Sequence, residues 1–286
     1  FFGPPRNDCP LKSSLLFLLA QGMGGSVSKP SAAITVDLST FRFRDGEEHR
    51  VPDGFLAEWS KLQSVVTWPL SGATAVGHRF LFQCVSLTGV YFDSLMDVET
   101  IGDLFLCECR GLRFIDARPL RFVRTIGHGF LSGCTAVTII DLSKMTSIRS
   151  IGSSFLAGCT QLRHVDLSAL SQLNAISSGF LCGCSSIASL DLAAFARVTV
   201  VGDRFLADCA QLSAIDLRAL TNVRTIGDGF LSGCSALRAV DLGPIGNVRS
   251  VGSKFLAGCR SLTVIDVSPG ITDALSHVPS FLDGCN

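Results

Sequence analysis

The sequence has no apolar run long enough to cross a bilayer and no cluster of basic residues. Its longest apolar run near the start, Leu15 to Ala20, has six residues, whereas a membrane-spanning helix needs about 20. Lys+Arg and Asp+Glu both number 24 in the 286 residues, so the formal net charge is zero. No global charge therefore attracts nucleic acid or an anionic membrane. We expect neither a transmembrane segment nor a nucleic-acid partner.

The chain is rich in apolar residues, and they recur with a regular period. Hydrophobic residues make up 47% of it, which excludes a disordered protein. A Phe-Leu pair recurs every 25 residues, at Phe55, Phe80, Phe105, Phe130, Phe155, Phe180, Phe205, Phe230 and Phe255, and once more after 26 residues at Phe281. A fixed period of this length is the sequence signature of a stacked repeat protein.

The repeat unit reads I-G-x-x-F-L-x-G-C-x-x-L-x-x-V-D-L-x-x-L-x-x-V-x-x. Two short extended pieces are predicted in each unit, L-x-x-V-D-L as in Leu162–Leu167 and V-x-x-I-G as in Val223–Gly227. The F-L-x-G-C stretch is predicted to form about one 3₁₀ turn, and the glycine of I-G to let the chain turn freely. Because stacking buries each apolar column against itself, we predict a mainly β solenoid with short 3₁₀ or helical turns, a right-handed stack of 25-residue coils.

Two parts are expected along the chain, a segment at 1–33 with a capping helix and a solenoid of about ten units at 34–286. Ile34 to Leu38 resembles the V-D-L strand, and the charged stretch Phe41 to Arg50 is predicted to protrude as a loop. Near the end the rhythm is interrupted at Pro269, Gly270 and Pro279. This interruption is either a C-terminal irregularity or a bend before further coils, since we expect the chain to be a fragment that continues beyond residue 286.

Nine of the twelve cysteines share one column, at Cys84, Cys109, Cys134, Cys159, Cys184, Cys209, Cys234, Cys259 and Cys285. Parallel side chains in neighbouring coils keep their Cβ atoms about 5 Å apart, beyond the usual range for a disulfide. We therefore predict a row of buried free thiols that act as small hydrophobes. Cys107 and Cys182 lie three coils apart and cannot share a zinc ion. Free thiols favour a reducing compartment.

Seven aspartates also share a column and are predicted to point outward, at Asp116, Asp141, Asp166, Asp191, Asp216, Asp241 and Asp266. Stacked carboxylates repel one another unless they are compensated. The favoured explanation is that each accepts a backbone N–H from the turn that follows it. Two alternatives stay open, a surface that binds basic segments of a partner and a ladder that binds cations.

Another outward column varies from coil to coil while the core columns stay uniform, and it begins with Phe114, Ile139 and His164. Exposed apolar side chains of this size indicate a surface that another molecule covers. The candidate partner-binding residues are accordingly Phe114, Ile139, His164, Asp116, Asp141, Asp166, Asp191, Asp216 and Asp241.

Catalysis is not expected. The five histidines fall in different columns or in distant coils, so no nucleophile, base and orienting acid recur at a workable spacing. A solenoid spreads its functional groups along a line, whereas an active site needs them to converge. We therefore expect no enzyme activity, no cofactor and no metal in this chain.

The recurring I-G-x-x-F-L-x-G-C-x-x-L stretch resembles the BspA-like, treponemal-type leucine-rich repeats, whose pattern is I-G-x-x-A-F-x-x-C-x-x-L. The resemblance runs from Ile34 to Asn286, with a slightly longer unit and Asp-Leu in place of the family's frequent Ile-Pro. It implies a scaffold that binds a protein partner through an extended sheet, often in surface or secreted recognition and adhesion proteins. The alternative is a regulatory or substrate-recruiting arm of an enzyme whose catalytic domain lies elsewhere. The compartment, intracellular or cell-surface, stays open.

Overall fold

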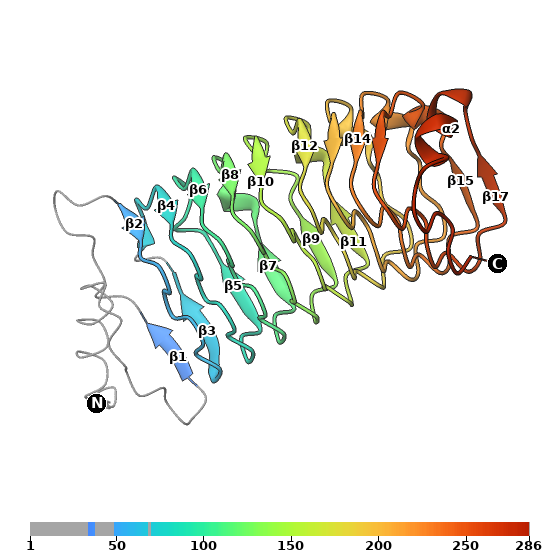
Figure 1. The fold of residues 1–286 in the computed structure, drawn as a ribbon. Helices are drawn as coiled ribbons and strands as arrows, with labels where there is room; N and C mark the ends of the chain where they lie inside the picture. Colours follow the sequence, from blue (N-terminus) through green and yellow to red (C-terminus); the bar gives the residue numbers. More distant parts are fainter. Residues whose placement is uncertain (1–33, 38–48, 68–69, 286) are drawn as a thin grey trace, which may run out of the picture.

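The computed structural model describes residues 34–37, 49–67 and 70–285. These residues form a single stack of coils in which each 25-residue unit makes one turn (Figure 1). The predicted β solenoid is thereby confirmed. The capping helix predicted at 1–33 and most of the loop predicted at Phe41 to Arg50 lie outside the described residues.

Two rows of parallel strands run along the stack. In each row, a residue pairs with the residue 25 positions away in the neighbouring coil, as His164 does with Ile139 and Val200 with Thr225. The first row consists of two-residue strands, β2 (Arg50–Val51), β4 (Ala75–Val76), β6 (Thr100–Ile101), β8 (Thr125–Ile126), β10 (Ser150–Ile151), β12 (Ala175–Ile176), β13 (Val200–Val201), β14 (Thr225–Ile226) and β16 (Ser250–Val251). The second row carries the V-D-L segments, β1 (Ile34–Asp37), β3 (Leu62–Val66), β5 (Gly89–Tyr91), β7 (Phe114–Asp116), β9 (Ile139–Asp141), β11 (His164–Asp166), β15 (Ala239–Asp241) and β17 (Val264–Asp266).

Whereas the corners after β5 and β9 contain turns only, short helices occupy the corner after most of the V-D-L segments from β7 onward. They are the 3₁₀ helices η2 (Arg118–Leu120), η3 (Ser168–Leu170), η4 (Ala193–Phe195), η5 (Arg218–Leu220) and η6 (Gly243–Ile245), and the α-helix α2 (Pro269–Leu275). Helix α2 accounts for the irregularity predicted near the end of the sequence, and it buries Ile271 and Leu275 against the last coils.

The F-L-x-G-C stretch is not a 3₁₀ turn, and that prediction was wrong. Its leucine has a left-handed backbone in every coil, with φ between 51° and 62° from Leu56 to Leu282. In this stretch every second residue has a left-handed backbone, for example Gly129, Leu131 and Gly133. A helix needs consecutive residues with right-handed backbone angles, so none forms here. The stretch is a run of tight turns, and a non-glycine residue in this conformation costs about 1–2 kcal/mol.

Stacked phenylalanines form the centre of the core. The rings from Phe55 to Phe255 lie 4.9–5.8 Å apart between centroids, are nearly parallel, and are all fully buried. Phe281 continues the row at 6.0 Å with a tilted ring. The packing of this column offsets the strain of the adjacent left-handed leucines.

The glycines of the I-G motif are required by close packing rather than by a turn, which corrects the prediction made for them. None of them has a positive φ. A Cβ built on Gly102 would lie 2.7 Å from the backbone of Gly77, and one on Gly152 would lie 2.5 Å from that of Gly127. A side chain at this position would push neighbouring coils apart.

Among the coils from Phe80 to Phe255, one departs from this rule, because Ser177 takes the place of the glycine. The row of short strands is interrupted there, and it divides into a five-stranded sheet that ends at β10 and a four-stranded sheet that begins at β12 (Figure 1). In other coils the glycine N–H donates to the preceding coil, as Gly152 does to the carbonyl of Ile126 at 2.8 Å. At the interruption the hydroxyl of Ser177 donates instead, to the carbonyl of Ile151 at 2.7 Å.

Candidate functional site

The predicted site residues gather on one surface, the V-D-L face, which we define as the outward side chains of β5, β7, β9, β11, β15 and β17 and of residues 189–191 and 214–216. Inward residues of these strands, such as Ile115 and Val165, are buried, whereas Phe114, Ile139 and His164 are exposed. The aspartates of the next column are exposed or half-buried. The alternation predicted from the sequence is therefore confirmed.

Each aspartate of the column stabilises the turn that follows it. One Oδ atom accepts the backbone N–H two residues later, at 2.8–3.1 Å, in Asp116, Asp141, Asp166, Asp191, Asp216 and Asp241. This local hydrogen bond was the favoured explanation of the column, and it is confirmed at these six positions. Because it uses only one oxygen of each carboxylate, the second oxygen stays available to other groups.

Arginines compensate the column at two places. The guanidinium groups of Arg118 and Arg218 form ion pairs with Asp116 and Asp216, two residues earlier in the chain. The side-chain hydrogen bond from Arg218 lowers the pKa of Asp216 to about 2, and the one from Arg118 also lowers the pKa of Asp116. Between these two pairs, Asp141, Asp166 and Asp191 form no ion pair with a lysine or arginine in the described part of the chain.

Arg218→Ala is expected to raise the pKa of Asp216 from about 2 towards its ordinary value of 3.8. The folded state holds the carboxylate charged, so its contribution to stability is present above the unfolded pKa and is lost as pH falls towards 2. The check is an NMR titration of the aspartate carboxyl carbons between pH 1.5 and 6. Asp116 serves as the internal control, and an Asp216 midpoint that does not move in the variant would contradict this assignment.

An apolar patch occupies one end of the V-D-L face. Tyr91 and Ile139 are each 60% exposed and Phe114 is 48% exposed. The rings of Tyr91 and Phe114 are in contact, with centroids 5.6 Å apart and planes tilted by 49°. We call Tyr91, Phe114 and Ile139 the aromatic patch. Tyr91 was missed from the sequence because it stands in the aspartate column, one coil before the aspartates begin, and its contact with Phe114 depends on the stacking.

The family comparison agrees with the geometry. The model of the BspA type leucine-rich repeat region matches six copies, over residues 74–209 and 170–278. Together these overlapping ranges run from residue 74 to residue 278, well over half of the chain. The chain belongs to the BspA-type leucine-rich repeat family. No curated protein matches its sequence.

Several solved structures of bacterial leucine-rich repeat proteins are similar to this BspA-type chain. A leucine-rich repeat protein from Bacteroides ovatus is 15% identical, with 86% of this chain and 83% of that one covered and a TM-score of 0.47. The T. pallidum leucine rich repeat protein is 24% identical, with coverages of 50% and 63% and a TM-score of 0.38. The functional domain of InlJ from Listeria monocytogenes, which includes a cysteine ladder, is 12% identical, with coverages of 80% and 63% and a TM-score of 0.31.

The column cysteines of this BspA-type chain are free thiols, as predicted. Each thiol donates a hydrogen bond to the carbonyl of the Phe-Leu leucine of the preceding coil, with Sγ–O distances of 3.0–3.3 Å from Cys84 to Cys285. The left-handed leucine turns its carbonyl inward, so the thiol satisfies a buried acceptor as well as filling space. Burial raises the pKa of Cys259 to about 12 and that of Cys134 well above its ordinary value.

Native alkylation is expected to separate the cysteines of the BspA-type repeats by burial. Cys182 and Cys285, which are half-buried, should react with iodoacetamide at pH 8 before buried column members such as Cys134 and Cys234. Peptide mass spectrometry without reductant gives the order. All of these cysteines should be labelled after unfolding, and resistance of the buried ones in urea would reveal disulfides and overturn the free-thiol assignment.

A second hydrogen-bond column of the repeats was not recognised from the sequence. The residue after the glycine position of the I-G motif accepts, through its side chain, the backbone N–H of its equivalent in the next coil, at 2.7–3.1 Å. These residues are Asp53, His78, Asp103, His128, Ser178, Asp203 and Asp228. The sequence does show that each of these positions holds Asp, Ser or His, whose side chains can all accept a hydrogen bond. Nδ1 of His78 and of His128 therefore serves the coil stacking.

Three or more metal-ligating side chains converge nowhere in the described ranges of this BspA-type chain. Across the same ranges, no helix is long enough and apolar enough to span a bilayer.

Proposed function

We propose that this BspA-type chain is a non-catalytic interaction module that binds a protein partner through the V-D-L face, centred on the aromatic patch. The observation that supports it is the exposure of Tyr91, Phe114 and Ile139 on the neighbouring strands β5, β7 and β9. A cluster of this kind is costly in water and is typical of protein interfaces, where aromatic residues are enriched. The aspartate column borders the patch and would provide its polar rim.

The chemical character of the patch changes along the V-D-L face. Beyond Ile139 the same column continues as His164, Ser189, Ala214 and Ala239, and the next large apolar side chain in it is Val264, which is 50% exposed. A partner that buries the aromatic patch would thus lie over the first half of the solenoid. The setting we propose, from the family resemblance, is recognition or adhesion at a cell surface.

Replacing Phe114 by Glu and Ile139 by Lys together is expected to reduce partner recovery in a pull-down by more than about tenfold, since interface hot spots cost about 2 kcal/mol or more each. Val264→Glu is the matched control, because it introduces a charge in the same column at a similarly exposed site. Circular dichroism melts would confirm that both variants fold. Equal recovery by the patch variant and the Val264 variant would remove the patch from the interface.

A further inference from the structure

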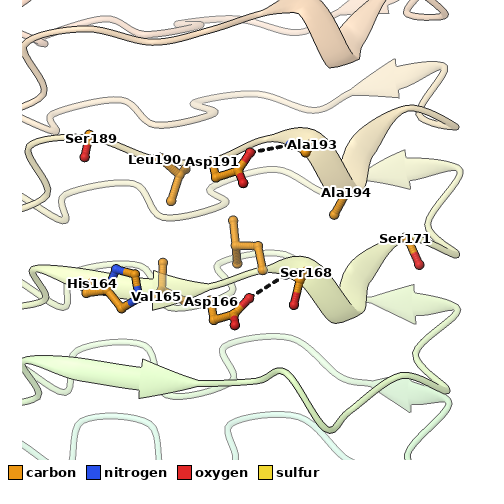
Figure 2. Close-up of a pocket in the computed structure, with 11 residues that line it drawn as sticks. His164, Val165, Asp166, Ser168, Ser171, Ser189, Leu190, Asp191, Ala193 and Ala194 are labelled. Atoms are coloured by element: carbon orange, nitrogen blue, oxygen red, sulfur yellow. Dashed lines mark hydrogen bonds between the residues drawn. The ribbon is translucent and has the colours of Figure 1, made fainter.

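A groove separates two neighbouring coils on the V-D-L face. It lies between β11 with the turn after it and residues 189–194, and has a volume of about 710 Å³ (Figure 2). Its floor is apolar, with Val165, Leu167 and Leu190. Asp166 and Asp191 line it from opposite coils, and none of its lining residues is a lysine or arginine. This volume lies within the usual range of ligand sites.

The groove exists because these two coils separate on two of their sides. On the V-D-L face, β11 pairs only with β9, and among the described residues no backbone hydrogen bond joins 163–167 to 188–192. On the other face, β10 and β12 are unpaired where Ser177 replaces glycine. On the third side, formed by the F-L-x-G-C stretches, the two coils stay bonded. The N–H of Leu181 donates to the carbonyl of Phe155 at 3.0 Å, and the N–H of Gly158 donates to the carbonyl of Cys182 at 2.7 Å. Among the described residues, backbone hydrogen bonds therefore join these two coils on this third side alone.

Opposite carboxylates make the groove suited to a cation. Asp166 and Asp191 each use Oδ1 for the N–H of the following turn, at 2.9 and 2.8 Å, as the dashed lines in Figure 2 show. Neither has the arginine two residues later that pairs with Asp116 and Asp216, because Ser168 and Ala193 stand there. No lysine or arginine of the lining compensates this charge, although Ser168 and His164, which also line the groove, lower the pKa of Asp166.

We propose that this groove receives an arginine side chain carried by an extended segment of the protein partner, an inference that rests on the proposed function and specifies its partner. The planar guanidinium can meet two carboxylates at once, and the methylene stem can lie along Val165 and Leu190. The negative charge and the apolar floor of the groove both fit this one occupant.

Titration of the folded chain with a blocked pentapeptide, acetyl-Ser-Val-Arg-Val-Ser-amide, tests the inference. Saturable NMR shifts are expected at the amides of 165–168 and 189–193. The same peptide with citrulline, which has no charge, should bind at least ~10-fold more weakly, because two charge-assisted hydrogen bonds are lost. No shifts, equal binding of the citrulline peptide, or shifts spread evenly along the whole aspartate column would each overturn the proposal.

Two variants distinguish the groove from charge alone. Asp166→Asn with Asp191→Asn should abolish the shifts, whereas Asp97→Asn should not, because Asp97 is an exposed aspartate that lies outside the groove. Ser177→Gly changes no lining residue but should let the coils close and weaken binding ~10-fold. Full binding by this last variant would show that the groove plays no part.

Failure of the proposed function would look different. If the arginine peptide binds while the Phe114 and Ile139 double variant recovers its partner normally, the aromatic patch is refuted and the groove stands. If the patch variant loses its partner and the peptide shows no shifts, the interface stands and the groove is refuted.

Discussion

Replacing Phe155 by alanine is expected to lower the free energy of unfolding by about 3–5 kcal/mol, the range for removing a buried aromatic ring. Phe155 is fully buried, and its ring lies 5.4 Å from that of Phe130 and 5.5 Å from that of Phe180. Next to the ring, the N–H of Leu156 donates to the carbonyl of Phe130 and the N–H of Leu181 donates to the carbonyl of Phe155, so the two neighbouring coils cannot collapse fully into the cavity. The lost ring contacts with two neighbours add to the cost of the cavity.

Urea unfolding followed by circular dichroism measures this loss. Phe114→Ala is the control, because the same ring is removed from a 48% exposed site, and it should cost about 1 kcal/mol or less. If the two variants were equally stable, the phenylalanine column would not be the main source of coil-to-coil stability. A repeat array responds locally, so exchange of amide hydrogens should speed up most in the two coils that flank residue 155.

The stack itself could be predicted from the sequence because a solenoid converts sequence columns into spatial columns. Once the 25-residue spacing of Phe80, Phe105 and Phe130 is recognised, burial of those rings, of the cysteines and of the inward valines follows without any knowledge of tertiary contacts. The outward direction of Asp141 and its bond to the following turn could be predicted for the same reason, since both are local to one unit.

Features that depend on how closely two coils approach could not be predicted in this way. The role of Gly152 was assigned to a turn, because glycine in a sequence signals backbone freedom and close packing equally well. The left-handed φ of Leu131 could not be predicted from the residue type, since leucine rarely adopts this conformation. The groove beside Asp166 depends on the absence of hydrogen bonds between two coils whose sequences match the repeat in most columns.

Gly152→Ser is expected to destabilise the protein by about 1–3 kcal/mol, the usual cost of overpacking. A Cβ on Gly152 would lie 2.5 Å from the backbone of Gly127 and of His128, so β10 must move away from β8. The native Ser177 shows the outcome, because its coil has lost the strand pairing and gained a side-chain bond to Ile151 in exchange. The amide of residue 152, which now donates to Ile126 at 2.8 Å, should lose its protection from hydrogen exchange.

Gly89→Ser provides the matched control for this substitution. Gly89 has an ordinary φ, and the nearest atom to its added Cβ is the carbonyl oxygen of Phe114 at 3.8 Å, so the free energy of unfolding should change by about 0.5 kcal/mol or less. The reverse change, Ser177→Gly, should join β10 to β12 and protect the amide of residue 177. Should Gly152→Ser behave like Gly89→Ser, with residue 152 still protected, coil spacing would be set by something other than this column. The Ser177 coil would then owe its separation to its other differences, such as Phe195, which contacts Phe180 edge-on at a position where most coils have leucine.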